Sequence, residues 1–282
     1  MFRLNTKLLL MFLSIIIGIY FILSLLLKIS IYNTNFIIIF VMLFFLIVLV
    51  HGCKTLGYRE FLVFFIIAYI ITMLYEYTYG LGFGEFFNCK PYYSDLLGPK
   101  FIGKIPYIIP LVWSISFYCA FTMTNIIFNK IKTNPIYEEV ISYKWVLNIF
   151  GMGLVSGLIM ASWDLINDPL MVRVGAWSWS YQGLYYGIPL LNFEGWIEIP
   201  LVIFIVYSFY LNKVKKVQVY IGGEEQSNYT LIVVLLYLAL FIIYSIYAYY
   251  ENVSNVIPWA SITMIPISII TTIKFFKNKT KK

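Results

Sequence analysis

The chain has 282 residues, of which 61% are hydrophobic and only 12% are charged, and its mean hydropathy is +0.85. A soluble domain of this length could not bury so much apolar side chain, so the composition excludes that class and predicts an all-α integral membrane protein. The net charge of +7 is explained by loop topology and attraction to anionic lipids, and no nucleic-acid partner is expected.

Eight long runs free of charged residues follow one another along the chain. Each reaches or approaches the roughly 20 residues that a helix needs to cross the hydrocarbon core. The predicted spans cover 8–27, 29–50, 61–75, 105–129, 145–163, 199–212, 226–250 and 252–273. The third is expected to extend through Glu76 to about Tyr79, and the sixth is short unless it begins near Glu194. We find no internal repeat or soluble appendage, so residues 1–282 are predicted to form a single polytopic membrane domain.

The basic residues predict the orientation of the spans. Fifteen of the 20 lysines and arginines fall in segments that are cytoplasmic if the N-terminus is inside, and cytoplasmic loops are enriched in these residues. The sequence therefore predicts a multi-pass protein of the cell membrane with both termini inside. The first run follows Arg3 and Lys7 as in a signal peptide, but it is too long and lacks a cleavage site, which favours a signal anchor.

The cysteines and the single histidine give little indication of a metal site. Cys53, Cys89 and Cys119 have no metal-like spacing and are expected on the inner side, in an outer loop and in mid-span. His51 is expected at the inner end of the second span as an interfacial polar residue. No metal and no cofactor are predicted, and nucleotide-binding and hydrolase motifs are missing from the sequence.

The acidic residues indicate function most sharply, because a carboxyl group near the bilayer is costly unless it faces a cavity or a partner. Five of the thirteen fall in inner loops and are expected to be solvated: Glu60, Glu138, Glu139, Glu224 and Glu225. The other eight lie in the outer half: Glu76, Glu85, Asp95, Asp164, Asp168, Glu194, Glu198 and Glu251.

Three groups of these outer acids are expected at helix ends. Glu76 falls at the C-terminal end of the third span, and Asp164 and Asp168 fall at that of the fifth, where the helix dipole disfavours ionisation. Glu194 and Glu198 would lie in the first turns of the sixth span, where the dipole favours the carboxylate. If these ends converge, one site would combine neutral and charged carboxyl groups, as general acid and base catalysis requires. The alternative is that these side chains meet the headgroup region, and that Asp168 simply closes the helix before Pro169.

The second indication is aromatic. Trp and Tyr residues are dense between Trp177 and Trp196, and five glycine or proline residues lie between Gly175 and Gly195. An interfacial belt would account for some of them. The packing of so many into one glycine-rich stretch favours a re-entrant or cavity-lining element in the outer segments 80–104 and 167–198, whose walls would suit an apolar ligand or a transient cation.

Two blocks of the sequence resemble the integral-membrane carotenoid biosynthesis proteins, which include carotenoid 1,2-hydratases and bisanhydrobacterioruberin hydratases. The first block joins Glu76, Gly80, Phe83 and Gly84 to LGPKFIGKIPYIIPLVW at 97–113. The second joins DLINDP at 164–169, GAWSW at 175–179, YYGIPLLNF at 185–193, Gly195 and Trp196. The sequence departs from the family at FFNCKPYYSD after Gly84 and at Glu194, so neither Glu194 nor Glu198 is carried over.

The resemblance implies hydration of the terminal isoprenoid double bond of an acyclic carotenoid, without a cofactor. Either Asp164 or Glu76 would protonate the alkene, and Asp168 would orient the attacking water. Aromatic faces would shelter the tertiary carbocation, and Asn192 would hold the water or the new hydroxyl. The residues expected to bind the substrate are Trp113, Trp177, Trp179, Tyr185, Tyr186, Asn192 and Trp196.

Two other functions remain open from the sequence. A membrane prenyltransferase would need two Asp-rich helices to hold magnesium and diphosphate, and only the DLIND segment hints at one. A proton-coupled transporter or lipid-binding protein would use Glu76 and Asp164 as a proton relay. The expected partners are an apolar isoprenoid and the lipid bilayer; the oligomeric state is not predicted.

Overall fold

The computed structural model describes residues 6–26, 33–78, 90–128, 142–213 and 224–280. Eight helices within these ranges are long and apolar enough to cross a membrane, which confirms the predicted all-α membrane fold. They are α1 (Thr6–Leu26), α2 (Thr34–Thr55), α3 (Tyr58–Thr78), α5 (Ile108–Ile127), α6 (Tyr143–Arg173), α7 (Leu190–Lys213), α8 (Glu224–Tyr250) and α9 (Ile257–Thr280). Two 3-10 turns, η2 (Asp95–Leu97) and η4 (Ser254–Val256), lie before α5 and α9.

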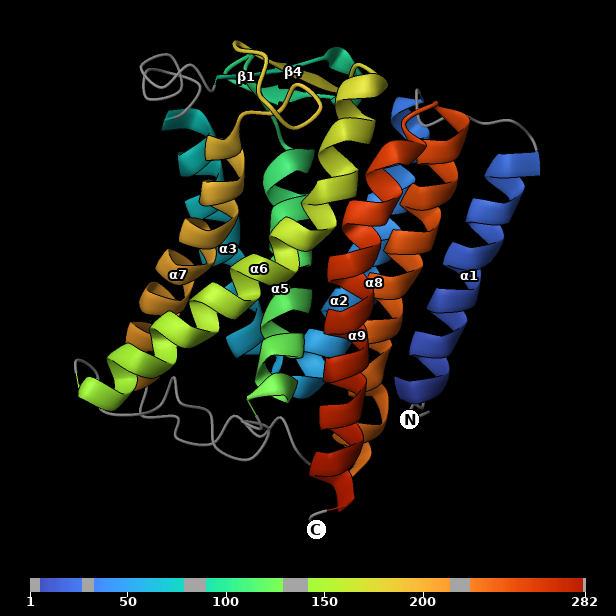
Figure 1. The fold of residues 1–282 in the computed structure, drawn as a ribbon. Helices are drawn as coiled ribbons and strands as arrows, with labels where there is room; N and C mark the ends of the chain where they lie inside the picture. Colours follow the sequence, from blue (N-terminus) through green and yellow to red (C-terminus); the bar gives the residue numbers. More distant parts are fainter. Residues whose placement is uncertain (1–5, 27–32, 79–89, 129–141, 214–223, 281–282) are drawn as a thin grey trace.

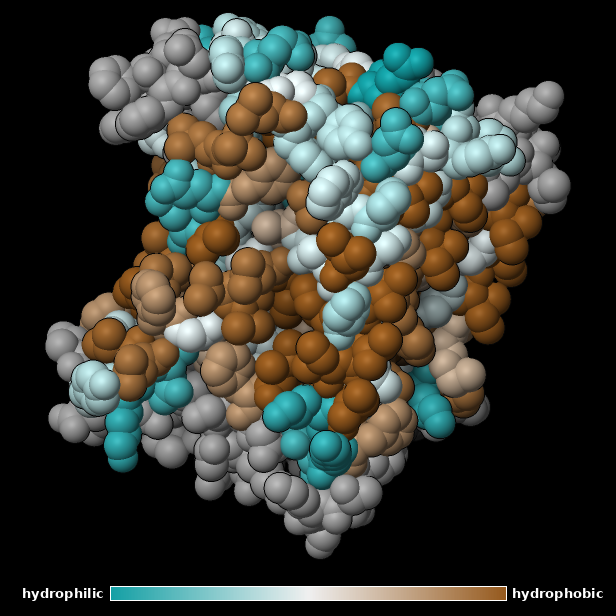
Figure 2. All heavy atoms as spheres, viewed as in Figure 1, coloured by the Kyte–Doolittle hydropathy of each residue, from teal (hydrophilic) through white to brown (hydrophobic). Residues whose placement is uncertain are grey.

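The face of the bundle drawn in Figure 2 is mostly apolar over its middle and more polar toward both ends. On α3, for example, Leu62, Ile66, Ile70 and Leu74 form an exposed stripe with one residue per turn. A stripe of this kind on a soluble protein would be a liability, whereas in a bilayer it faces lipid. Both termini lie at the same end of the bundle, as an even number of spans requires (Figure 1).

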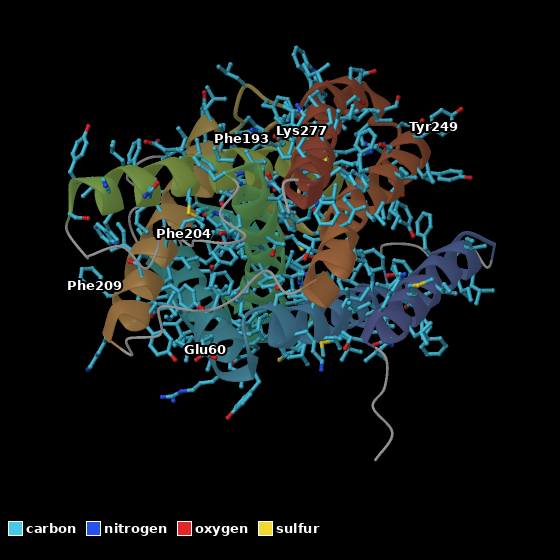
Figure 3. All side chains as sticks on the ribbon, turned by 90° about the horizontal axis from the view of Figure 1, so that it is seen from below. Glu60, Phe193, Phe204, Phe209, Tyr249 and Lys277 are labelled. Atoms are coloured by element: carbon cyan, nitrogen blue, oxygen red, sulfur yellow. The ribbon has the colours of Figure 1, made fainter. Side chains whose placement is uncertain are left out.

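The central helix is α5, which packs against α2, α3, α6, α8 and α9 (Figure 1). Its core is aromatic: Phe117 and Phe121 contact Phe204, which points inward from α7 (Figure 3), at ring-centroid distances of 5.2 and 5.6 Å. Hydroxyl groups inside the bundle bond to the carbonyl one turn earlier, as Ser114 does to Pro110, or across helices, as in the 2.8 Å pair of Thr124 and Ser156. These hydroxyl groups are thus satisfied without water.

The closest helix pair is α6 and α7, because two glycines of α6 face the backbone of α7. A Cβ atom added to Gly157 would lie 2.7 Å from the Ile197 Cα, and one on Gly153 would lie 3.1 Å from the Leu201 Cα. The missing side chains allow the two helix axes to approach. This approach fixes the distance between the acids of α6 and the first turns of α7.

Short strands cover the end of the bundle opposite the termini (Figure 1). Strand β1 (Pro91–Tyr93) pairs antiparallel with β4 (Trp177–Trp179), so that Tyr93 lies opposite Trp177. Strands β2 (Lys100–Phe101) and β3 (Ile105–Pro106) form a hairpin before α5. The aromatic segment that was predicted to be re-entrant or cavity-lining therefore contributes a strand to this cap.

Two helices, α6 and α7, extend well beyond the spans predicted for them. The fifth helix was expected to end near residue 163 but continues to Arg173 with Pro169 inside it, and the sixth begins at Leu190. A span defined by the absence of charge stops at the first acid, whereas Asp164 and Asp168 lie buried within α6, and Glu194 and Glu198 lie within α7 on its exposed side. The third helix ends at Thr78, close to the predicted end, and Tyr79 is outside the described residues.

Candidate functional site

A cavity that is partly open to solvent lies under the strand cap, between the ends of α3, α5, α6 and α7 that the cap covers. The space between its wall atoms, solvent at the mouth included, is about 650 Å³. We call it the acid cavity. It is lined by Tyr75, Glu76, Pro91, Tyr93, Ile109, Val112, Trp113, Trp163, Asn167, Asp168, Trp177, Trp179, Leu191, Asn192 and Trp196. In the described parts of the chain, neither lysine nor arginine lines it, so its carboxyl groups have no cation in the wall.

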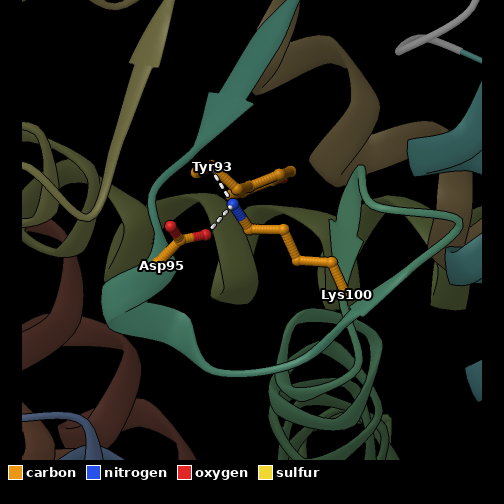
Figure 4. A network of polar contacts seen from close by, with 3 residues as sticks. All are labelled: Tyr93, Asp95 and Lys100. Atoms are coloured by element: carbon orange, nitrogen blue, oxygen red, sulfur yellow. Dashed lines mark hydrogen bonds and ion pairs between the residues drawn. The ribbon is translucent and has the colours of Figure 1, made fainter.

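Glu76 enters the cavity from the last turn of α3 and is buried. Its Oε2 accepts a hydrogen bond from the hydroxyl group of Tyr93 at 2.7 Å. Tyr93 is held by strand pairing with Trp177, whose ring it meets edge to face at 6.1 Å. The Lys100 Nζ donates to the Tyr93 carbonyl at 2.8 Å and to Asp95 Oδ1 at 2.7 Å, which ties down the turn after β1 (Figure 4). The cap thus positions the group that contacts Glu76.

Asp164 and Asp168 lie one turn apart on one face of α6, and both are buried. The Asn192 side-chain amide, from the first turn of α7, donates to Asp168 Oδ2 at 2.6 Å and to Asp164 Oδ2 at 3.0 Å. Asn167 donates to Asp164 Oδ1 at 3.3 Å. Asp168, Asn167 and Asn192 line the cavity, whereas Asp164 lies behind them. The close approach of α6 and α7 creates this four-residue network.

Tyr93 contacts Glu76 and lies within electrostatic range of Asp168 and Asp164. Burial raises the pKa of Tyr93 well above its ordinary value of 10.0, and the hydrogen bond to Glu76 and the nearby Asp168 add to this increase. At the surface of the cap the opposite effect operates on Asp95, because Lys100 holds the pKa of that carboxyl group below its usual value. Tyr93 is therefore a neutral hydroxyl donor at physiological pH.

Tryptophan rings form most of the remaining wall. Trp113 and Trp196 stack face to face at 3.6 Å with an angle of 7° between their planes, and Trp163 meets Trp196 edge to face at 5.9 Å. The indole nitrogens of Trp163 and Trp179 are buried and have no hydrogen-bond partner among the described residues. Aromatic faces of this kind bind apolar groups and stabilise a nearby cation. No three His, Cys, Asp or Glu side chains in the described ranges are grouped to hold a metal ion.

A family model described as carotenoid biosynthesis protein matches residues 36–266, which is more than half of the chain. The chain belongs to this family. Neither a curated protein nor a solved structure matches the sequence. The family match confirms the resemblance drawn from the two sequence blocks. Both blocks reach the acid cavity in this carotenoid biosynthesis protein: the first supplies Glu76 and Trp113, and the second supplies Asp168, Asn192 and Trp196.

The structure brings most of the residues predicted for the site into one cavity wall, including Trp177 and Trp179. Tyr185 and Tyr186 lie outside it: the Tyr185 hydroxyl donates to the Leu165 carbonyl at 2.7 Å, and Tyr186 is exposed in a turn with φ of 50°. Gly80, Phe83, Gly84, Glu85 and Cys89 lie outside the described residues.

Two interpretations of the outer acids were wrong. Glu194 and Glu198 are exposed on α7 and do not line the acid cavity, so they supply no charged partner there. Asp164 and Asp168 are not at a helix end, because α6 continues to Arg173. The helix dipole acts mainly within the last turn, so it bears on Glu76 in α3 and not on these two residues.

Two residues at the inner end were expected to be solvated or interfacial and are buried instead. Glu60 is 4% exposed in the first turn of α3, at the end that faces the viewer in Figure 3. His51 is fully buried, and its Nδ1 lies 2.7 Å from the Tyr118 hydroxyl, which in turn is 2.9 Å from the Thr55 Oγ1. Both residues are far along the bundle from the cap and take no part in the acid cavity.

Sequence reasoning missed Tyr93, Tyr75, Trp163 and Asn167 as cavity residues. Asn167 lies three residues after Asp164, on the same helix face, so helical spacing could have found it. Trp163 directly precedes the first acid of the DLINDP motif. Nothing in the sequence marks Tyr93 as a cavity residue, because its position depends on strand pairing. Its partner in that pairing, Trp177, is 84 residues away in the chain.

Proposed function

We propose that this membrane protein of carotenoid biosynthesis hydrates the terminal isoprenoid double bond of an acyclic carotenoid in the cell membrane, giving a tertiary alcohol. The observation that carries the proposal is that Glu76 of α3 and Asp168 of α6 face one tryptophan-walled cavity. Carboxyl groups on two walls of a cavity can serve as acid and base on the same substrate. The tryptophan rings of the wall suit a hydrocarbon end group.

Glu76 is assigned as the acid, and Asp164 is not, because Asp164 does not line the cavity. Glu76 lies in the last turn of α3, where the helix dipole favours the neutral carboxyl group. Its Oε2 accepts the Tyr93 hydroxyl, which leaves Oε1 to hold the proton that is transferred. Tyr93 is a positioning residue for this acid.

Asp168 is assigned as the base. Its carboxylate is stabilised by the short hydrogen bond from Asn192. Burying two adjacent negative charges costs more than burying one, so Asp164, the more deeply buried of the pair, is assigned as the neutral partner.

In the proposed reaction, the π electrons of the double bond form a C–H bond with the Glu76 proton, leaving a tertiary carbocation on the neighbouring carbon. Trp113, Trp163 and Trp196 stabilise this cation through their ring faces and edges. A water molecule forms the new C–O bond and passes one proton to Asp168. The proton returns to Glu76 through water, so each turnover adds one water to the substrate.

The test is expression in a host that accumulates lycopene, with pigments separated by chromatography and identified by mass spectrometry. Wild type should give a pigment heavier by one water, and Glu76→Gln and Asp168→Asn should each reduce it by about 10²–10⁴-fold. Glu194→Gln is the matched control, because Glu194 is an exposed acid outside the cavity, and it should behave as wild type. No hydrated pigment from membrane-inserted wild type contradicts the proposal; magnesium-dependent release of diphosphate would indicate prenyl transfer instead.

A further inference from the structure

A second cavity lies beside the acid cavity, between α2, α5, α6 and α8, and the space between its wall atoms, open solvent included, is about 690 Å³. We call it the apolar cavity. Aromatic rings stand on two of its sides, Phe36 and Phe40 from α2 and Tyr244 and Tyr247 from α8. Among the described residues, none that lines it is charged. The Tyr247 hydroxyl is within 3.3 Å of Ser24 Oγ on α1, so this polar group is satisfied by another helix.

The two cavities have walls in common. Ile109, Val112, Asn167 and Trp177 line both of them. A further contact joins them, since Tyr244 of the apolar cavity meets Trp163 of the acid cavity edge to face at 5.9 Å. The Asn167 amide donates toward Asp164, so the polar atom at the boundary is directed to the acids. An apolar molecule that extends past the shared residues would have one end beside the acids. Its other end would lie among the hydrocarbon side chains and aromatic rings of the apolar cavity.

The different polarities of the two cavities match the two parts of a long substrate. Only the reacting end of an acyclic carotenoid needs acids and water, and the rest of the chain is hydrocarbon whose burial is favourable. We propose that the apolar cavity binds the linear hydrocarbon chain of the isoprenoid substrate while its end group occupies the acid cavity. The inference rests on the proposed function and adds a chain-binding site on α2 and α8, which the acid chemistry does not require.

The walls favour a conjugated isoprenoid chain over a saturated lipid chain. Phe36 and Phe40 stack at 6.0 Å with an angle of 18°, giving a continuous aromatic surface along α2. Trp177 supplies a further ring at the shared boundary. Flat π systems pack well against such surfaces.

The test measures binding separately from turnover. Glu76→Gln protein in phosphatidylcholine vesicles is titrated with lycopene, and quenching of tryptophan fluorescence by the polyene gives the Kd. Val41→Phe narrows the apolar cavity alone, since Val41 lines it and not the acid cavity. Met42→Phe is the matched control, because the neighbouring Met42 is 42% exposed on the outer face. We expect about 10-fold weaker binding in the first variant and unchanged binding in the second.

A short isoprenoid with the same end group, which reaches only the acid cavity, should bind Val41→Phe and its parent equally. The inference is overturned if Val41→Phe binds lycopene as tightly as Met42→Phe, as would occur if lipid chains fill the apolar cavity. It is also overturned if the short and long ligands are weakened alike. If no hydrated product forms but Val41→Phe still weakens the binding of lycopene and not that of the short isoprenoid, the proposed reaction is contradicted and the chain-binding site is supported.

A second measurement needs no variant, in case Val41→Phe does not fold. An acyclic isoprenoid carrying a diazirine near the middle of its chain is photolysed with the wild-type protein, and labelled peptides are identified by mass spectrometry. Label on residues 36–41 of α2 or 243–247 of α8 supports the chain site. Label confined to other helices, with none on these two segments, overturns it.

Discussion

At the scale of single residues, Asn192 joins α7 to α6 by donating to two carboxyl groups that lie one turn apart, Asp168 at 2.6 Å and Asp164 at 3.0 Å. Replacing it by leucine keeps a similar volume and removes both bonds. A hydrogen bond to a charged group contributes about 1.5–3 kcal/mol, so we expect kcat to fall about 10- to 100-fold with little change in KM. Steady-state turnover in vesicles measures this; an Asn192→Leu protein with wild-type kcat would contradict the role of the network.

Tyr93 gives a second prediction. Tyr93→Phe removes the hydroxyl that contacts Glu76 at 2.7 Å and leaves the ring on Trp177, so turnover should fall about 10-fold or more while the protein stays folded.

The pH dependence of this effect follows from the raised pKa of Tyr93. A phenol is a neutral donor below its pKa, and raising the pKa above 10.0 keeps it neutral over the whole range from about pH 6 to 9. The ratio of wild-type to Tyr93→Phe turnover should therefore be constant across that range. A ratio that falls toward one with a midpoint below pH 9 would show that Tyr93 ionises and would contradict its role as a neutral donor.

The residues differ in how far the sequence alone could place them. Glu76, Asp168 and Asn192 could be proposed as site residues, because polar side chains near the membrane are costly unless they have a partner or a function. The residues that bond to them could not all be proposed. The hydrogen bond from Tyr93 to Glu76, for example, depends on strand pairing that only the folded chain provides. Tyr185 was misplaced because an aromatic-rich segment does not reveal which ring faces inward.

At the scale of elements, α6 continues through Pro169, which has no N–H to donate to the Leu165 carbonyl one turn earlier. The Tyr185 hydroxyl occupies that carbonyl at 2.7 Å. The proline thus frees an acceptor inside the helix, and the loop before α7 supplies the donor. This exchange ties the loop to α6, and it explains why a helix expected to end before Pro169 does not end there.

A double-mutant cycle tests this link. Tyr185→Phe leaves the Leu165 carbonyl without its donor and should destabilise the protein by about 1–3 kcal/mol. In a Pro169→Ala background the new N–H can donate to the Leu165 carbonyl, so Tyr185→Phe should lower the free energy of unfolding by less. Thermal unfolding in detergent gives both values. Equal costs in the two backgrounds would show that Tyr185 does not replace the missing backbone donor.

The contact between α6 and α7 gives a prediction about Gly157. A methyl group there would meet the Ile197 Cα at 2.7 Å and the Trp196 carbonyl at 2.9 Å, which are backbone atoms that cannot move cheaply. Gly157→Ala should destabilise by about 1–3 kcal/mol and lower turnover, because it shifts Asn192 away from the acids. Gly151→Ala on the same helix is the control, since its nearest neighbour is a side-chain atom at 3.6 Å. Equal melting temperatures for the two variants would contradict the tight contact.

Charge-free runs predicted that eight helices exist, but not where those that carry the site begin and end. The apolar pattern is interrupted by Asp164, Asp168 and Glu194, and a window of hydropathy treats each as a boundary. In the folded protein the first two are shielded by α7 and the cap, and Glu194 lies on the outside of α7 near its start. Whether an acid is shielded from lipid depends on the elements packed around it, and the hydropathy of one stretch of sequence does not show those elements.

At the scale of the whole molecule, eight spans place both termini at one end, and the strand cap closes the other (Figure 1). The excess of lysine and arginine near the termini predicts that their end is cytoplasmic. A fluorescent protein fused to the C-terminus should therefore fluoresce, and a cysteine introduced at the exposed Tyr92 of the cap should react with an impermeant reagent added outside. Labelling of Tyr92→Cys only after the membrane is opened would reverse the orientation.

The measurement that tests the central claim most directly is turnover of lycopene by the purified protein in vesicles made with H₂¹⁸O. We predict a product heavier by one labelled water, with the ¹⁸O on the tertiary carbon of the end group, and about 10²–10⁴-fold less of it from Glu76→Gln or Asp168→Asn. Unchanged lycopene from wild type, or a product whose oxygen comes from a source other than water, would contradict the proposed hydration.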